Sequence, residues 1–467
     1  MDRKTDRRAA LKLLTAAPLG LALSAALAHE AVAQTPRGTF GARAATGPGE
    51  TGAGSWKTWP SSSGNGLRSV AAQPAADPNV VNDWNATAVN VIATDAATPA
   101  AEVAPYLGFV QAAVYNAVVG ITRRYSLYKS NAQPGPMASP QAAAAAAAHR
   151  VLMTYYGHVP AAVTRLTDAY TASIGALPND PSTTQGIQYG RQTAERIIAL
   201  RAEDGRYGPN TFDMPPAPGV WRPTPPANAP FFGKFLCETT PMMIESPSQF
   251  RPGPPPDMAS AEYATDFQEV KAFGAKEGSA RTPLQTETAL FAASIVPGPL
   301  QAALRDLAVR REMDISDRAR LFAAVSMSIA DTTITVWDSK VHFGFWRPIT
   351  AIQQADEDGN PATTADPTFE PLVPTPPYPD YTSGFNGVIG SLTRALTRVL
   401  GTDRIDLTIS SPLTNTTRYY EFADPLCADA VDARVWGGIH FRFADVAAMA
   451  QGQQVADWAA DRYFKPV

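Results

Sequence analysis

Apolar residues recur every three or four positions through most of the chain. Between residues 101 and 121, for example, Leu107, Val110 and Val114 would share one face of a helix. The same spacing predicts further helices over residues 142–156, 160–174, 183–200, 262–273, 285–293, 299–312, 316–340, 383–400 and 445–463. Nothing in the first half of the chain demands a strand. We therefore predict an all-α fold.

Residues 206–260 interrupt the helical pattern because they are rich in proline, which removes a backbone donor and breaks helices. Trp221 and Phe231 lie within this segment and favour burial, so we expect an ordered crossover rather than a slack linker. The part of the chain that follows residue 79 is longer than one simple hydrophobic core usually holds. We expect two helical bundles, residues 80–205 and 261–467, with long proline-rich crossover loops.

The first 79 residues have a different character. Paired Arg7 and Arg8 precede an apolar run that ends in small residues, which is the pattern of a twin-arginine signal peptide over residues 1–33. A membrane anchor is the alternative, but proline and glycine interrupt the short apolar run. Residues 34–79 are rich in small and polar residues, which predicts a flexible lead-in. We expect a periplasmic or secreted protein with no stable membrane anchor.

The formal net charge of −4 gives no reason to expect a nucleic-acid partner. The two cysteines, Cys237 and Cys427, either form one disulfide in an oxidising compartment or stay as free thiols. Neither belongs to a motif for zinc or for an iron–sulfur cluster. The sequence leaves the oligomeric state open, a homo-oligomer included.

Cationic and hydroxyl side chains stand in three separated segments of the second half. A multiply charged oxyanion in a partly buried site needs paired cations, because uncompensated burial of charge is prohibitive. Two arginines can each present a planar fork, a lysine acts as a point charge, and a serine–glycine pair at a helix start offers a hydroxyl and free N–H groups. One histidine adds a nucleophilic nitrogen. These candidate oxyanion ligands are Lys340, Arg347, Ser383, Gly384, Arg434 and His440.

The order K-x6-R-P, then S-G, then R-x5-H resembles the three-part motif shared by vanadium-dependent haloperoxidases and type 2 phosphatidic acid phosphatases. The runs WDSK (residues 337–340), DGNPATTADP (358–367) and GGIHF (437–441) are similar to the secreted bacterial branch of the haloperoxidases. The resemblance extends from about Asn82 to the C-terminus and implies the helical fold of that family. It also implies that the six candidate ligands bind vanadate or phosphate, with His440 as the metal ligand.

The resemblance implies hydrogen peroxide and halide as substrates, with a small organic molecule as acceptor of the oxidised halogen. Vanadate would serve as a Lewis acid without changing its oxidation state, and Lys340 would polarise the peroxide. Trp337, Tyr378 and Phe385 would lie on the halide side of the pocket, although aromatic residues near a site also serve as simple packing. In the phosphatase interpretation, the imidazole of His440 attacks phosphorus instead.

One position departs from the family pattern. The family has histidine after the serine–glycine pair, where it acts as acid and base, and this chain has Phe385, which can do neither. General acid–base catalysis typically contributes a factor of about 10² to 10⁴ in rate, so either activity would be impaired unless another group substitutes. His342 and Asn386 are candidate replacements, with purely structural roles as the alternative.

Three functions therefore stay open. Loss of the acid–base group is more damaging for cleavage of a phosphate ester with a poor leaving group than for oxidation of bromide. We predict a vanadate-dependent haloperoxidase that oxidises bromide or iodide before chloride. The alternatives are an acid phosphatase of the same superfamily and a diverged, non-halogenating oxyanion-binding protein.

Overall fold

The computed structural model describes residues 76–467, most of which are helical. The predicted signal peptide (1–33) and nearly all of the predicted lead-in (34–79) lie outside the described residues. The helices are α2 (Asn79–Val89), α3 (Ala100–Thr122), α4 (Pro140–Tyr156), α5 (Pro160–Gly175), α6 (Pro181–Leu200), α7 (Ala261–Gly274), α8 (Pro283–Ala292), α9 (Gly298–Arg310), α10 (Ile315–Phe343), α11 (Pro348–Gln353), α12 (Gly384–Leu400), α13 (Ala423–Trp436) and α14 (Arg442–Arg462).

Prolines and capping side chains fix where the helices begin. Pro140 occupies the first turn of α4, where its missing N–H costs nothing, and the preceding Ser139 accepts a hydrogen bond from the helix backbone. Thr282 and Gln285 form a reciprocal capping box at the start of α8. Asp314 accepts hydrogen bonds from the first free N–H groups of α10. These local signals explain why helical periodicity located most helices to within a few residues.

The predicted all-α class is confirmed, and the structure adds elements that the periodicity did not indicate. These are α2, α11, α13 and a short antiparallel hairpin of β1 (Arg404–Ser411) and β2 (Thr416–Phe422). In β1, buried Ile405, Leu407 and Ile409 alternate with more exposed residues, which is the signature of a half-buried strand. This two-stranded hairpin is the only β-sheet in the described residues, so the fold stays essentially helical.

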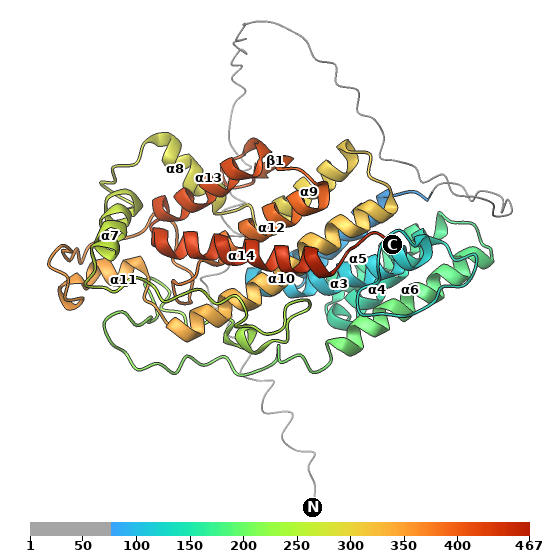
Figure 1. Ribbon diagram of the computed structural model, residues 1–467, viewed down its shortest axis with the longest axis horizontal. Coiled ribbons are helices and arrows are strands. Elements are labelled where there is room, and N and C mark those ends of the chain that lie inside the picture. The colour runs from blue at the N-terminus through green and yellow to red at the C-terminus, as the bar shows by residue number, and fades with distance from the viewer. Residues whose placement is uncertain (1–75) are drawn as a thin grey trace, which may run out of the picture. The chain divides into compact units, whose positions relative to one another are not determined.

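Helix α10 is the central element of the described residues. It packs against α3 from the first half of the chain and against α12 and α14 from the second half. Figure 1 shows α10 lying beside α14, with α3, α4 and α6 towards one end and α7, α11 and α13 towards the other. Because neighbours surround it, α10 buries nearly every residue from Ile315 to Lys340. One core thus serves helices from both halves, and the proposed boundaries of two bundles stay predictions.

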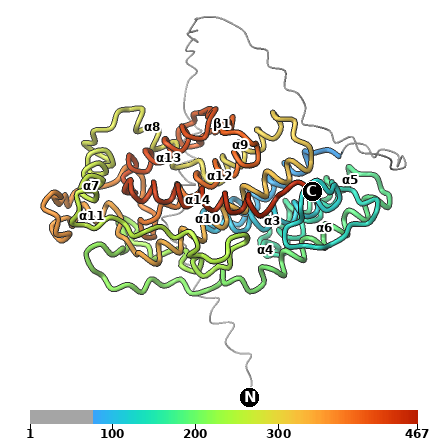
Figure 2. Tube along the Cα trace, in the orientation of Figure 1, coloured from blue at the N-terminus to red at the C-terminus, as the bar shows by residue number. Residues whose placement is uncertain are grey.

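Residues 206–260 form the ordered crossover that their aromatic residues predicted. Figure 2 shows this segment running as a long irregular trace from α6 to α7. Trp221 is buried, and its backbone N–H donates to the carbonyl of Gly344 at 2.7 Å. Trp346 N–H donates in turn to the carbonyl of Gly219 at 2.9 Å. The crossover therefore pairs with the chain just after α10 and leaves Trp221 and Phe231 in the core.

A buried carboxylate fastens the crossover to the middle of α10. Asp331 accepts hydrogen bonds from the backbone N–H groups of Met242 (2.6 Å), Met243 (2.6 Å) and Ile244 (3.0 Å). Burial raises the pKa of Asp331, and these three hydrogen bonds oppose that rise.

Cys237, in the same crossover, and Cys427 are both free thiols. Of the two alternatives for the cysteines, the structure therefore contains the free thiols and not the disulfide.

Replacing Asp331 with alanine is expected to lower the free energy of unfolding by about 3–5 kcal/mol, because three buried N–H groups lose their acceptor. Urea unfolding followed by circular dichroism measures the loss. Asp306→Ala is the control, since Asp306 is an exposed member of an i,i+4 pair with Arg310 and its removal costs less than about 0.5 kcal/mol. Equal losses in the two variants would contradict the anchoring role.

Candidate functional site

The candidate oxyanion ligands come from helix ends that meet at one place. Lys340 lies in the last turn of α10, which stops at Gly344 in the left-handed region (φ +57°). The chain then turns, and Arg347 precedes α11 in extended conformation. Ser383 caps the N-terminus of α12, as the sequence predicted. Arg434 lies in the last turn of α13, and His440 follows in the connection to α14.

Lys340 is fully buried and is held by main-chain carbonyls. Its Nζ donates to the carbonyl oxygens of Pro379 at 2.7 Å and Asp380 at 3.1 Å. Burial lowers the pKa of Lys340 well below its usual value, and nearby Arg347 lowers it further. An ammonium group has three N–H donors, so two carbonyls leave one of them for another acceptor.

Arg347 is also fully buried, and one of its nitrogens is left free. Nε donates to the carbonyl of Tyr378 at 2.7 Å, and Nη1 donates to the carbonyl of Ile439 at 2.7 Å. Nη1 also lies 3.0 Å from Nε2 of His440. Nη2 is buried and has no hydrogen-bond partner among the described residues. Burial lowers the pKa of Arg347, and the carboxylate of Asp380 opposes this effect.

Arg434 lies against the position where the chain departs from the family motif. Its guanidinium carbon is 5.0 Å from the centre of the Phe385 ring, a distance typical of a cation–π contact. Its Nε is buried without a hydrogen-bond partner in the described part of the chain. Burial lowers the pKa of Arg434. Phe385 therefore supplies a surface for the arginine rather than an acid–base group.

The side chain of Ser383 is already engaged at the start of α12. Its Oγ lies 3.5 Å from the N–H of Asn386 and 3.4 Å from Nδ2 of the same residue. Ser383 also hydrogen-bonds to Asp445, whose Oδ1 accepts from Asn386 Nδ2 at 2.7 Å. Burial raises the pKa of Asp445, and the Ser383 hydrogen bond opposes this rise. Asn386 thus reaches the site, where it links Ser383 to a carboxylate that sequence reasoning missed.

Asp380 is the second acidic residue that sequence reasoning missed. Its Oδ1 lies 2.7 Å from Nδ1 of His440 and 3.6 Å from Nη1 of Arg347. Burial raises the pKa of Asp380 to about 7, while Arg347 and Lys340 oppose this rise. Burial, together with Arg347, lowers the pKa of His440 well below its usual value. The available signal was one acidic residue in the proline–aromatic run at 376–381.

Aromatic rings form one wall beside the cations. The centres of the Trp337 and Tyr378 rings are 5.0 Å apart, and Lys340 Nζ lies 5.0 Å from the Tyr378 ring. The crossover supports this wall, because Trp337 Nε1 donates to the carbonyl of Phe232 at 3.2 Å. A Cβ added at Gly233 (φ +86°) would lie 2.6 Å from Trp337 Nε1, so this close approach requires glycine.

His342 does not join the site. His342 is exposed, and its imidazole contacts the ring of Phe343, with the ring centres 4.7 Å apart. The buried site residues lie on the other side of the helix turn, around Lys340. Of the two candidate replacements for the missing acid–base group, only Asn386 reaches Ser383. An amide cannot transfer protons as an imidazole does.

The site suits a tetrahedral oxyanion. Three cationic side chains lie close together, and two of them keep a buried donor without a partner, Arg347 Nη2 and Arg434 Nε. Buried donors without partners are rare in proteins and point to a missing acceptor. No group of three or more histidine, cysteine, aspartate or glutamate side chains that could hold a metal ion occurs in residues 76–467.

Solved structures share this arrangement of helices. A crystal structure described as the first bacterial vanadium-dependent iodoperoxidase superimposes with a TM-score of 0.71 at 22% identity, covering 85% of this chain and 98% of that one. A holo-type bacterial vanadium-dependent chloroperoxidase gives 0.65 at 18% identity, covering 84% and 98%. The fold is that of the vanadium haloperoxidases.

Sequence comparison supports the same relationship. A family model of the VCPO second helical-bundle domain matches residues 320–467, which contain all the candidate oxyanion ligands. The vanadium chloroperoxidase of Curvularia inaequalis is 26% identical, with 52% of this chain and 52% of that protein covered. The chain thus spans about half the length of this curated relative. The resemblance to the haloperoxidases, read from the three-part motif, is confirmed.

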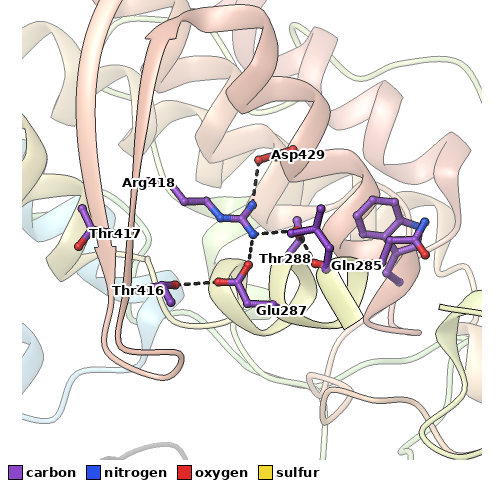
Figure 3. Close-up of a pocket in the computed structure, with 9 residues that line it drawn as sticks. Gln285, Glu287, Thr288, Thr416, Thr417, Arg418 and Asp429 are labelled. Atoms are coloured by element: carbon purple, nitrogen blue, oxygen red, sulfur yellow. Dashed lines mark hydrogen bonds and ion pairs between the residues drawn. The ribbon is translucent and has the colours of Figure 1, made fainter. Parts of the chain in front are cut away.

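A surface cavity outside the candidate site contains an arginine whose donors are paired. This cavity, about 490 Å³, lies between α8, the hairpin and α13. Figure 3 shows Arg418 at its centre, paired with Glu287, Asp429 (3.0 Å) and Thr288 (2.8 Å). Its cation is already compensated by two carboxylates, so this cavity lacks the free donors found at Arg347 and Arg434.

Arg434→Met is expected to leave the free energy of unfolding of the metal-free protein unchanged or to raise it by about 1–2 kcal/mol, because an unpaired buried cation is removed. Thermal and urea unfolding measure this change. The matched Arg418→Met variant loses three partners and is expected to unfold about 1–3 kcal/mol more easily. A large loss of unfolding free energy in Arg434→Met and none in Arg418→Met would show that the unpartnered donors of Arg434 do not destabilise the metal-free protein.

Proposed function

We propose that the protein binds vanadate at this site and uses hydrogen peroxide to oxidise iodide or bromide in preference to chloride. The observation that carries the proposal is the pair of buried, unpartnered arginine donors beside the imidazole of His440. The motif and the family model support it. The names of the similar proteins, an iodoperoxidase and chloroperoxidases, support peroxidase chemistry with a halide as the class of reaction.

Each cationic residue of the site would contribute a different donor to the oxyanion. Arg347 Nη2 and Arg434 Nε would donate to its oxygens, and Lys340 would use the N–H that the two main-chain carbonyls leave free. His440 would present Nε2. When bound, vanadate supplies a Lewis acid that activates hydrogen peroxide for attack by halide. Burial strengthens each of these contacts, because water no longer screens the charges.

The preference for iodide and bromide rests on two features. Trp337 and Tyr378 make an aromatic wall, which suits large and weakly hydrated halides better than chloride. Phe385 supplies no proton-transfer group, so the site favours the halides that are easiest to oxidise. The same lack disfavours phosphate-ester cleavage, in which an acid must protonate the leaving group.

Metal-free protein is expected to show no peroxide-dependent oxidation of iodide or bromide, and added orthovanadate is expected to restore it. Triiodide formation and bromination of a phenol-red indicator measure the two reactions. His440→Ala is expected to abolish the activity, and Asp306→Ala, on the exposed face of α9, is expected to leave it unchanged.

A folded protein that oxidises no halide in the presence of vanadate would sink this proposal. Hydrolysis of p-nitrophenyl phosphate by the same preparation, inhibited by orthovanadate, would then favour the acid phosphatase. Binding of orthovanadate without either reaction would favour a diverged oxyanion-binding protein.

Phe385→His is expected to raise the rate of bromide oxidation by about 10-fold to 100-fold, because it restores an acid–base group at the start of α12. Steady-state bromination over a range of pH measures the gain. Phe385→Leu is the control, because it removes the ring from Arg434 without adding a proton-transfer group. An equal gain in the leucine variant would mean that the aromatic ring was inhibitory and that no proton transfer had been restored.

A further inference from the structure

We propose that Asp380 is the positioning residue that keeps the proton of His440 on Nδ1 and leaves Nε2 as the unprotonated nitrogen, with its electron pair facing Arg347. The consequence for vanadate binding rests on the function proposed above. The tautomer itself is a property of the protein alone and follows from contacts on both sides of the imidazole ring.

The first contact is with an arginine. Nη1 of Arg347 lies 3.0 Å from Nε2 of His440. The same nitrogen lies farther, 3.4 Å, from Nδ1. A guanidinium group has only donors, so the nearer ring nitrogen, Nε2, is the one favoured to lack a proton. Protonation of Nε2 would set two N–H groups against each other. The position of Arg347 is itself fixed, because its Nη1 also donates to the carbonyl of Ile439.

The second contact is with a carboxylate. Oδ1 of Asp380 lies 2.7 Å from Nδ1 of His440, and both side chains are almost completely buried. Arg347 and Lys340 favour the ionised form of Asp380 against the effect of burial. That form has only acceptors, so the ring nitrogen facing it is the one that carries the proton. Oδ1 has no hydrogen bond of regular geometry among the described residues, and its remaining charged neighbour is Arg347 at 3.6 Å. Both contacts therefore select the same tautomer.

The main chain of Asp380 is a second partner of the imidazole. Its carbonyl already accepts a hydrogen bond from Lys340, whereas Oδ1 of the carboxylate has no other hydrogen bond among the described residues. Three cations surround the ring, and they disfavour the doubly protonated form. A carboxylate that hydrogen-bonds a metal-binding histidine, orients its ring and increases its basicity is a recurrent feature of metal sites. Because residue 385 is phenylalanine and His342 lies outside the site, His440 is the one histidine among the described residues of this site.

Histidine-selective ¹⁵N NMR of the full-length, metal-free protein tests the tautomer directly. The five histidines give few signals, and His440→Gln identifies the one from His440. The expected wild-type spectrum has a protonated Nδ1 and an unprotonated Nε2. Asp380→Asn keeps an acceptor oxygen and is expected to keep this pattern. Asp380→Ala is expected to shift a substantial part of the population to the Nε2-protonated tautomer.

Equilibrium dialysis against orthovanadate gives the second readout. Asp380→Ala is expected to bind roughly 10-fold to 100-fold more weakly than the wild type, and Asp380→Asn is expected to recover most of that loss. Asp338→Asn is the matched control, because this carboxylate on α10 pairs with Arg251 (2.7 Å) rather than with the imidazole. It is expected to change neither the tautomer nor the affinity.

A wild-type spectrum with the proton on Nε2 overturns the proposal, even if the alanine variant does not fold. An unchanged tautomer in folded Asp380→Ala also overturns it, because the main chain would then suffice. A wild type that shows the expected tautomer and binds orthovanadate, yet oxidises no halide, supports the role of Asp380 and refutes the proposed function instead.

Discussion

The crowding of three cations at one point, two of them fully buried, is the constraint on which the rest of the site depends. Lys340, Arg347 and Arg434 repel each other, and burial lowers the pKa of each. The protein compensates only in part, with main-chain carbonyls and the carboxylates of Asp380 and Asp445. Complete compensation would leave nothing to attract an anion. The unpartnered nitrogens on the two arginines are therefore the feature on which the proposed anion binding rests.

The helices supply what such a pocket needs, because each helix end brings one ligand and its own unpaired backbone groups. The C-terminal turn of α10 carries Lys340, and Ser383 opens α12. Loops alone would not hold charged side chains together against their repulsion. The crossover completes the frame by pairing with the chain after α10 and by binding Asp331 through three N–H groups.

Sequence reasoning identified the features that depend on local pattern. Helical periodicity located long helices such as α3 and α10, and the motif spacing identified Lys340, Arg347 and His440 before their proximity was known. It missed α13, whose alanine- and aspartate-rich sequence has no continuous apolar stripe. Asp380 was also missed, because its contact with an imidazole 60 residues away depends on how the chain folds and not on any spacing.

The contact between Gly233 and the indole of Trp337 separates two properties of the site along the chain. The candidate oxyanion ligands lie at or near helix ends in the second half, whereas the aromatic wall is supported by an irregular segment that precedes them. The same segment pairs through Trp221 and Gly219 with the chain just before Arg347. A change at Gly233 would therefore act first on the aromatic wall, whereas a change near Trp221 would also reach the cationic residues.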